Sequence, residues 1–91
     1  MCEAISEESE IYADIQVERS KQIARWGDQF HTNSQWFLIE SEELGEVARD
    51  ILDGQHINKL RTELVQVAAV AVAWINDLDK RYGYHNQPEA P

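Results

Sequence analysis

The sequence predicts an all-α protein, and three observations carry that prediction. Apolar residues recur every three to four positions instead of alternating. Glycine and proline are scarce, at 4 and 2 of 91 residues, and glycines follow the long periodic segments. The stretch rich in β-branched residues near the C-terminus is too long for one strand. A chain of this length forms a single domain, residues 1–91, whose small core makes a partner subunit expected.

The first helix is expected from Ser6 to Trp26. Ser6 is the predicted N-cap, and the acidic residues that follow it suit the positive end of the helix dipole. Residues at four-residue spacing form a stripe that ends at Trp26, and Gly27 ends the helix. Residues 1–6 are expected to be a flexible end.

The second and third helices follow two polar connections. Asn33 or Ser34 is the predicted N-cap of a helix from about Trp36 to Asp53, and Gly54 suits the position after it. Asn58 is the predicted N-cap of a third helix that continues without glycine or proline to Gly83. Residues 82–91 are expected to form a frayed tail.

The charge and cysteine content exclude several functions. Seventeen acidic against eight basic residues give a formal net charge of −9, which opposes binding to nucleic acid or to an anionic membrane. The only cysteine, Cys2, excludes an intrachain disulfide and a thiolate zinc site. The longest apolar run is too short to span a bilayer, and the acidic start is unlike a signal peptide. We therefore expect a soluble cytoplasmic protein.

The second helix separates its apolar and acidic residues. Its apolar arc contains Trp36, Phe37, Leu44, Val47, Ala48 and Ile51. Its acidic flank contains Glu42, Glu43, Glu46, Asp50 and Asp53. Solvated helix faces usually mix charges because like charges one turn apart repel, yet Arg49 is the only base in this helix. The flank is either an unusually acidic wet surface or part of a site.

The third helix is apolar nearly all round and should be buried on almost every side. A narrow polar stripe formed by Glu63, Gln66 and Asp77 interrupts it. Glu63 either reaches water near the helix start or needs a cation. If the last two helices pack antiparallel, Glu43 and Glu46 face Glu63 and Gln66.

Oxygen donors in such a group suit Mg²⁺ or Mn²⁺, which bind carboxylates together with substrate phosphates. An acidic pocket repels phosphates unless divalent ions reverse its sign. The composition therefore favours a metal-bridged nucleoside triphosphate over a directly bound one.

The segment EELGEV at residues 42–47 resembles the EExxE signature of the MazG-like, all-α nucleoside triphosphate pyrophosphohydrolases. Glu63 follows Glu46 by 17 residues, where that family has an ExxD motif. RWGDQFH at residues 25–31 is similar to the segment before the acidic helix in small members, and its QFH is similar to a stretch of dCTP pyrophosphatases. ELVQVAAV, beginning at Glu63, resembles their third helix, so the likeness covers about residues 18–79.

The resemblance implies a small MazG-like domain that hydrolyses a (d)NTP to the monophosphate and pyrophosphate, in nucleotide-pool sanitation. It implies Mg²⁺ held by Glu43, Glu46 and Glu63, with water attacking the α-phosphate. Glu42 would hold a further ion or take the proton from that water. The apolar third helix favours a homodimer or homotetramer in which a partner completes a four-helix core.

Gln66 departs from the family pattern, because it stands where the ExxD motif has an aspartate. Either fewer carboxylates hold the metal, or another acid compensates, or catalysis is slow or lost. Glu40, three residues before Glu43, is a candidate ligand, unless it lies at a subunit contact or a helix edge. Asp50 and Asp77 are candidates for an outer shell around the site.

Substrate binding is assigned to residues beside the acidic helix. Trp26, Gln29 and His31 can stack on a base and hydrogen-bond its edge, although Trp26 also suits a core position and His31 a plain loop. Lys59 either contacts phosphate or simply solvates its helix end, and Asp77 is placed on the substrate side. Trp36 and Trp74 are assigned to packing.

Two other functions remain open on the sequence. One is a catalytically impaired MazG-like protein that binds or senses nucleotides, which the change at Gln66 permits. The other is a purely structural helical oligomerisation domain.

Overall fold

The computed structural model describes the backbone of residues 2–83 and the side chains from residue 7 onward. This part of the chain forms three helices and no strand, so the all-α class is confirmed. The helices are α1 (Cys2–Trp26), α2 (Asn33–Leu52) and α3 (Ile57–Tyr82). No helix in the described range is long and apolar enough to cross a membrane. Residues 84–91 of the expected tail lie outside this range, and Tyr82, expected to begin that tail, is still the last residue of α3.

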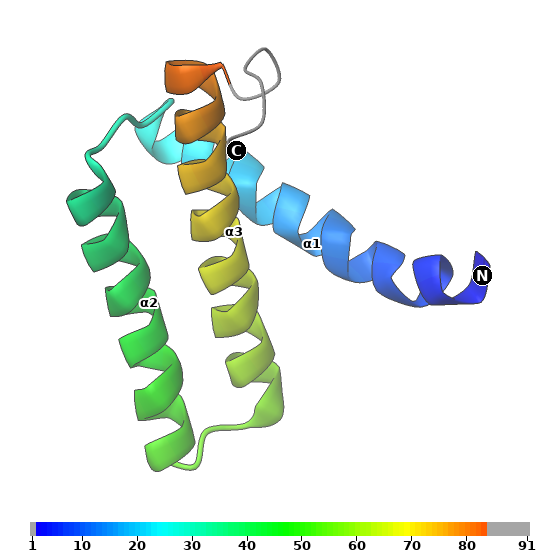
Figure 1. Ribbon diagram of the computed structural model, residues 1–91. Helices are drawn as coiled ribbons and strands as arrows, with labels where there is room; N and C mark the ends of the chain where they lie inside the picture. The colour runs from blue at the N-terminus through cyan, green and yellow to red at the C-terminus, as the bar shows by residue number, and fades with distance from the viewer. Residues whose placement is uncertain (1, 84–91) are drawn as a thin grey trace, which may run out of the picture.

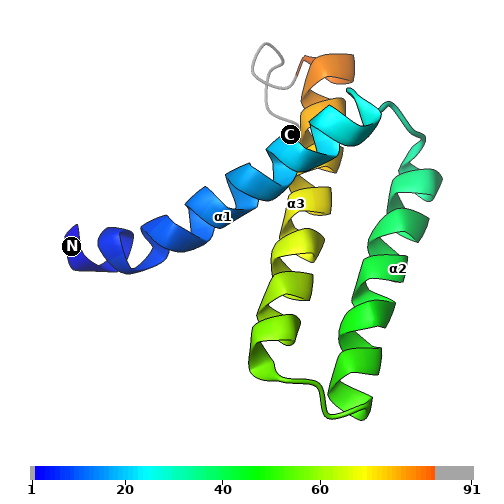
Figure 2. The ribbon, with the colours of Figure 1, turned by 180° about the vertical axis from the view of Figure 1, so that it is seen from behind.

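The chain arranges α2 and α3 as an antiparallel hairpin, and α1 crosses α3 at a steep angle (Figure 1). Seen from behind, α1 passes in front of α3, so it covers one side of that helix and leaves α2 clear (Figure 2). Asp14 of α1 and Arg61 of α3 form an ion pair of 2.9 Å at this crossing. On the other side of the hairpin, residues 2–83 place no helix.

Two predicted helix starts are wrong. The backbone is already helical at Cys2, so Ser6 lies inside α1, where good helix formers such as Ala4 extend the helix. The N-cap of α2 is Thr32, not Asn33 or Ser34. Thr32 Oγ1 accepts from the Gln35 amide at 3.1 Å and Gln35 Oε1 accepts from the Thr32 amide at 2.9 Å. Only Thr32 has a glutamine three residues later, which is the requirement of this reciprocal cap.

The start of α3 also differs from the prediction at Asn58. The N-cap is His56, whose Nδ1 accepts from the Asn58 amide at 3.0 Å. The predicted ends hold, because Gly54 follows α2 at φ +66° and Gly83 ends α3 at φ +61°. An L side chain is strained at these angles, so glycine suits both positions.

The buried core of the described chain is small. Trp36, Val70 and Ala73 form it, and Ile39 and Trp74 pack against them. The packing role expected for Trp36 and Trp74 is therefore confirmed. Trp26 does not belong to the core, because it is 55% exposed and stacks only under the Arg25 guanidinium, 4.9 Å from its ring centroid.

Beside its apolar core the hairpin buries acids on both helices, and it leaves several large apolar side chains exposed. Asp50 of α2 and Glu63 of α3 are buried, whereas Phe37, Leu44 and Ile75 are half or more exposed. The expectation that α3 is buried on nearly all sides is not met within one chain. The reason is that α1 and α2 cover only part of α3. A stripe that includes Leu64 and Ile75 stays exposed.

Candidate metal centre

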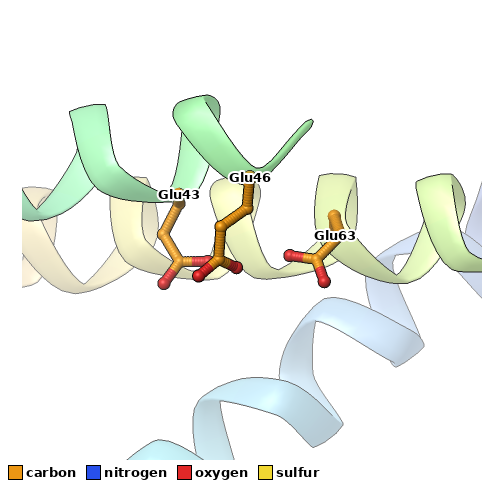
Figure 3. A group of neighbouring side chains, drawn as sticks. All are labelled: Glu43, Glu46 and Glu63. Carbon is orange, nitrogen blue, oxygen red and sulfur yellow. The ribbon is translucent and has the colours of Figure 1, made fainter. Parts of the chain in front are cut away.

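Three glutamate side chains converge at the middle of the α2–α3 interface. Glu43 and Glu46, one turn apart on α2, point toward Glu63 on α3 (Figure 3). One carboxylate oxygen from each lies within 4.8 Å of the others. The antiparallel arrangement expected from the sequence thus brings together three of the four expected donors, which we call the carboxylate cluster.

Glu46 of this cluster is exposed, but Glu43 and Glu63 each enclose one oxygen that has no donor, which a wet acidic face does not do. Glu63 is only 8% exposed, and its Oε2 and the Glu43 Oε2 are enclosed with no partner in the described chain. Burial first, and then the charges of Glu46 and Glu63, raise the pKa of Glu43. Burial and the proximity of Glu46 raise the pKa of Glu63 against the opposing effect of Lys59.

A divalent cation fits these donors. Enclosed carboxylate oxygens lose their hydration, and a cation replaces it while relieving the repulsion between the acids. Oxygen-only ligands favour hard ions such as Mg²⁺ and Mn²⁺. The orphaned oxygens of Glu43 and Glu63 therefore match the metal that the sequence resemblance implies.

Glu40 and Glu42 occupy different positions relative to the cluster. Glu40 is half-buried, its Oε1 is enclosed without a partner, and burial raises its pKa. Its charge also raises the pKa of Glu43, so it lies near the cluster without belonging to the group of three. Glu42 is exposed and belongs neither to the cluster nor to the adjacent cavity. The roles predicted for both residues remain predictions.

Lys59 lies against carboxylates. Its Nζ is 3.5 Å from Asp50 Oδ1 and 3.4 Å from Glu63 Oε1. Asp50 first, and then Glu63, raise the pKa of Lys59, so the ammonium stays charged. In this arrangement Lys59 acts as a counter-ion at the end of the cluster nearest the α2–α3 turn.

A cavity of about 390 Å³ opens beside the cluster, where α1 approaches the hairpin. Its apolar wall consists of Trp36, Ile39, Val70 and Ala73. Glu43 and Gln66 line it on the side of the cluster. Trp26, Gln29 and His31, the residues predicted to contact a base, also line it. Three of the expected substrate residues and two of the expected metal residues thus share one space, whereas Lys59 and Asp77 do not line it.

Asp77 does not line this cavity but anchors residues that do. Its Oδ2 accepts from Trp36 Nε1 at 2.7 Å and from the His31 amide at 3.0 Å, and Arg81 lies 3.1 Å from Oδ1. Burial alone would raise the pKa of Asp77, but these donors and the Arg81 charge lower it. The His31 ring meets the Trp36 ring edge-on at 4.8 Å. Asp77 therefore fixes the connection between α1 and α2.

Sequence reasoning missed the contribution of α1 to the cavity. Glu18, Gln22 and Arg25 line it from the C-terminal half of that helix. A signal was present, because Glu18 and Gln22 fall on the stripe that begins at Ile11 and ends at Trp26. Polar residues that interrupt an apolar stripe indicate a surface facing a cavity instead of a packed core.

Comparisons of the chain with models of protein families, with curated proteins and with solved structures found no match.

Proposed function

We propose that this protein is a Mg²⁺-dependent nucleoside triphosphate pyrophosphohydrolase that releases pyrophosphate and a nucleoside monophosphate. The observation that carries the proposal is the carboxylate cluster of Glu43, Glu46 and Glu63, whose enclosed oxygens lack donors and whose neighbour is a cavity. The MazG-like sequence pattern at residues 42–47 supports the same activity. Mn²⁺ is expected to substitute for Mg²⁺ because its ligand preference is similar.

The cluster residues would hold the metal, and the bound ion would neutralise phosphate charge and polarise the phosphoryl oxygen. The cavity walls exclude water from one side of the substrate, and Trp26, which lines the cavity and is 55% exposed, offers the apolar surface that a base requires. Gln29 and His31 offer polar groups for the base edge. Glu42 remains the candidate to accept a proton from the attacking water, since it lies on the same helix and reaches solvent.

We further propose that the protein works as a homodimer or homotetramer. The outward arc of α2, including Phe37, Leu44 and Ile51, and the exposed stripe of α3, including Leu64 and Ile75, leave large apolar side chains in water. By helical spacing, both face the side of the hairpin that α1 does not cover. A second hairpin packed there would complete a four-helix core.

The proposed assembly is tested by sedimentation and by dilution. A dimer should persist at micromolar protein, and its melting temperature should fall on dilution because association stabilises the fold. Ile75→Glu, which places a charge in the exposed stripe, should yield monomers. A wild-type monomer whose melting temperature does not change with concentration would exclude the assembly.

The proposed activity is tested with a panel of canonical and modified triphosphates, Mg²⁺ and a pyrophosphate assay. Pyrophosphate release that is lost in Glu46→Gln and in the presence of chelator supports the enzyme. Tight triphosphate binding without release supports the second candidate, a nucleotide-binding or sensor protein, which the neutral Gln66 beside Glu43 in the cavity favours. If triphosphates are neither bound nor hydrolysed, the remaining function is that of a structural oligomerisation domain.

A further inference from the structure

A fourth buried acid lies beyond the carboxylate cluster, toward the α2–α3 turn. Asp50 sits one turn after Glu46 in the last turn of α2 and is only 7% exposed. Its Oδ1 lies 3.5 Å from Lys59 Nζ. Its Oδ2 is enclosed and has no hydrogen-bond partner in the described part of the chain.

Lys59 satisfies the acids that it contacts only in part, because it donates one long hydrogen bond, to Glu63 Oε1, and an ion pair without a hydrogen bond to Asp50. A charge-assisted N–H···O bond is about 2.7–2.9 Å long, whereas this ammonium stands 3.4 Å from Glu63 and 3.5 Å from Asp50. Each of the two carboxylates keeps one enclosed oxygen without a donor. The Lys59 side chain itself is 49% exposed, so its ammonium can move into solvent without rearrangement of the helices.

The charge in this part of the interface exceeds what one divalent ion and Lys59 neutralise together. When ionised, Asp50, Glu43 and Glu63 place three negative charges inside the interface and the exposed Glu46 adds a fourth at its edge, against three positive ones from Lys59 and a single divalent ion. Buried carboxylates without compensation are costly. Acid-rich phosphoryl-transfer sites commonly meet this condition with two ions that share a carboxylate.

We infer that Asp50 and Glu63 form a second divalent-cation position at the turn end of the cluster, and that Lys59 fills this position until a divalent ion displaces it. Glu63 then serves both positions, one oxygen facing each. Lys59 sets the affinity of the second position, because its ammonium competes with the metal for the same oxygens. The inference rests on the proposed metal centre but not on hydrolysis.

The test counts Mn²⁺ ions bound per chain, by calorimetry and by electron paramagnetic resonance of free Mn²⁺, without nucleotide. The wild-type protein should bind two ions, one tightly and one weakly. Asp50→Asn should bind one, with the tight affinity retained. Lys59→Met should bind two, with the weaker ion tightened about tenfold or more because a competing charge within 4 Å is gone. Lys59→Gln, which keeps a polar side chain, replaces Lys59→Met if that variant does not fold.

Arg61→Met is the matched control. It removes one positive charge two residues away on the same helix, but Arg61 pairs with Asp14 of α1 and not with the cluster. The weaker affinity should change by less than about twofold in this variant, because exposed charges are screened.

Several results would overturn the inference. The first is a single bound Mn²⁺ ion in both the wild-type protein and Lys59→Met. The second is two bound ions in Asp50→Asn. The third is an equal change in the affinity of the weaker ion in Lys59→Met and Arg61→Met. Lys59 would then be a salt bridge that only closes the hairpin. Failure of the proposed centre gives a different pattern, since Glu46→Gln would leave the tight ion unaffected. Two ions without pyrophosphate release would reject the enzyme and retain the second position.

Discussion

Asp77 and Glu63 are buried acids on the same helix, yet their surroundings differ completely. Asp77, 3% exposed, receives hydrogen bonds from Trp36, His31 and Arg81. Glu63 faces two other carboxylates and one distant ammonium, and its Oε2 has no donor among the described residues. The pKa of Asp77 is lowered and that of Glu63 is raised. Two acids with similar burial therefore differ in whether the surrounding residues stabilise their ionised form.

The difference separates an acid that stabilises the fold from acids that weaken it without a ligand. Hydrogen-bond donors offset the cost of burying the Asp77 carboxylate, so Asp77 is ionised in the native structure. The glutamates of the cluster are costly when ionised unless a cation joins them. Four predictions test this contrast, ordered by the size of the expected effect.

The largest effect is expected for Asp77→Asn. The change removes the charge that faces Arg81 and weakens the bonds from Trp36 and His31, so the free energy of unfolding should fall by about 3 kcal/mol. Urea denaturation followed by circular dichroism measures it. Asp79→Asn, on the same helix without such a network, is the control. A loss under about 1 kcal/mol would show that Asp77 is not the anchor described.

The next effect concerns metal-dependent stability. Mg²⁺ at 100 times its dissociation constant should raise the free energy of unfolding by about 2.7 kcal/mol, because it binds only the folded cluster. Glu46→Gln should lose most of this gain. Asp53→Asn, an exposed acid on the same flank of α2, should keep it. If chelator and Mg²⁺ leave the wild-type melting temperature unchanged even with a triphosphate analogue, the cluster does not hold a metal.

A smaller effect is expected from Gln66→Asp. A carboxylate beside Glu43 should tighten Mg²⁺ about tenfold, equal to about 1.4 kcal/mol. If Glu40 supplies the missing charge, Glu40→Gln should weaken Mg²⁺ binding strongly in the wild-type protein. The same change should weaken it only slightly in the Gln66→Asp variant. Titration of all four proteins closes the cycle. Effects that add within ~0.5 kcal/mol would reject compensation by Glu40.

The smallest effect is a pH dependence without metal. The raised pKa values of Glu43 and Glu63 mean that the folded state binds protons more tightly than the unfolded state. Their stabilising contribution is therefore lost as pH rises through the raised values. The melting temperature should increase by a few degrees as the pH is lowered from neutrality toward the ordinary glutamate pKa of about 4.3, and saturating Mg²⁺ should abolish this trend.

Asp77 gives the opposite sign at lower pH. Its pKa is lowered in the folded state, so its stabilisation is present above the ordinary aspartate pKa of about 3.9 and is lost as pH falls further. Without metal, stability should thus be highest at a pH below the raised pKa values of Glu43 and Glu63 and above the lowered pKa of Asp77. A melting temperature that falls steadily from pH 7 to pH 5 would contradict the contrast between the two acids.

The local sequence pattern was sufficient to predict the three helices and the placement of neighbouring acids on one helix face. Glycines marked the ends of α2 and α3, and the three-residue spacing of Glu43 and Glu46 placed both on one face. The caps at Thr32 and His56 were missed because a cap depends on the bonds that a particular side chain makes: a reciprocal pair with Gln35 for Thr32, and a single bond from the Asn58 amide for His56. Residue type alone favoured their neighbours.

Long-range partners were beyond the reach of the sequence. Asp77 obtains its donors from residues 46 and 41 positions away, and no periodicity reveals that meeting. The exposure of most of the apolar arc of α2 was also missed, since an apolar arc normally faces the interior of a single chain. The arc of α2 instead remains open, which one chain's pattern does not distinguish from a core face.

The short connection between α2 and α3 has a kinetic consequence. Only residues 53–56 separate the two helices, so their pairing closes a small loop at little entropic cost. The pairing of α1 with α3 must close a loop that contains the whole of α2. Helical hairpins with local contacts form first, so α1 should dock onto a hairpin that already exists. The glutamates of the hairpin would then meet before the wall of the cavity is built, and divalent ions would bind a folding intermediate that cannot yet enclose a nucleotide.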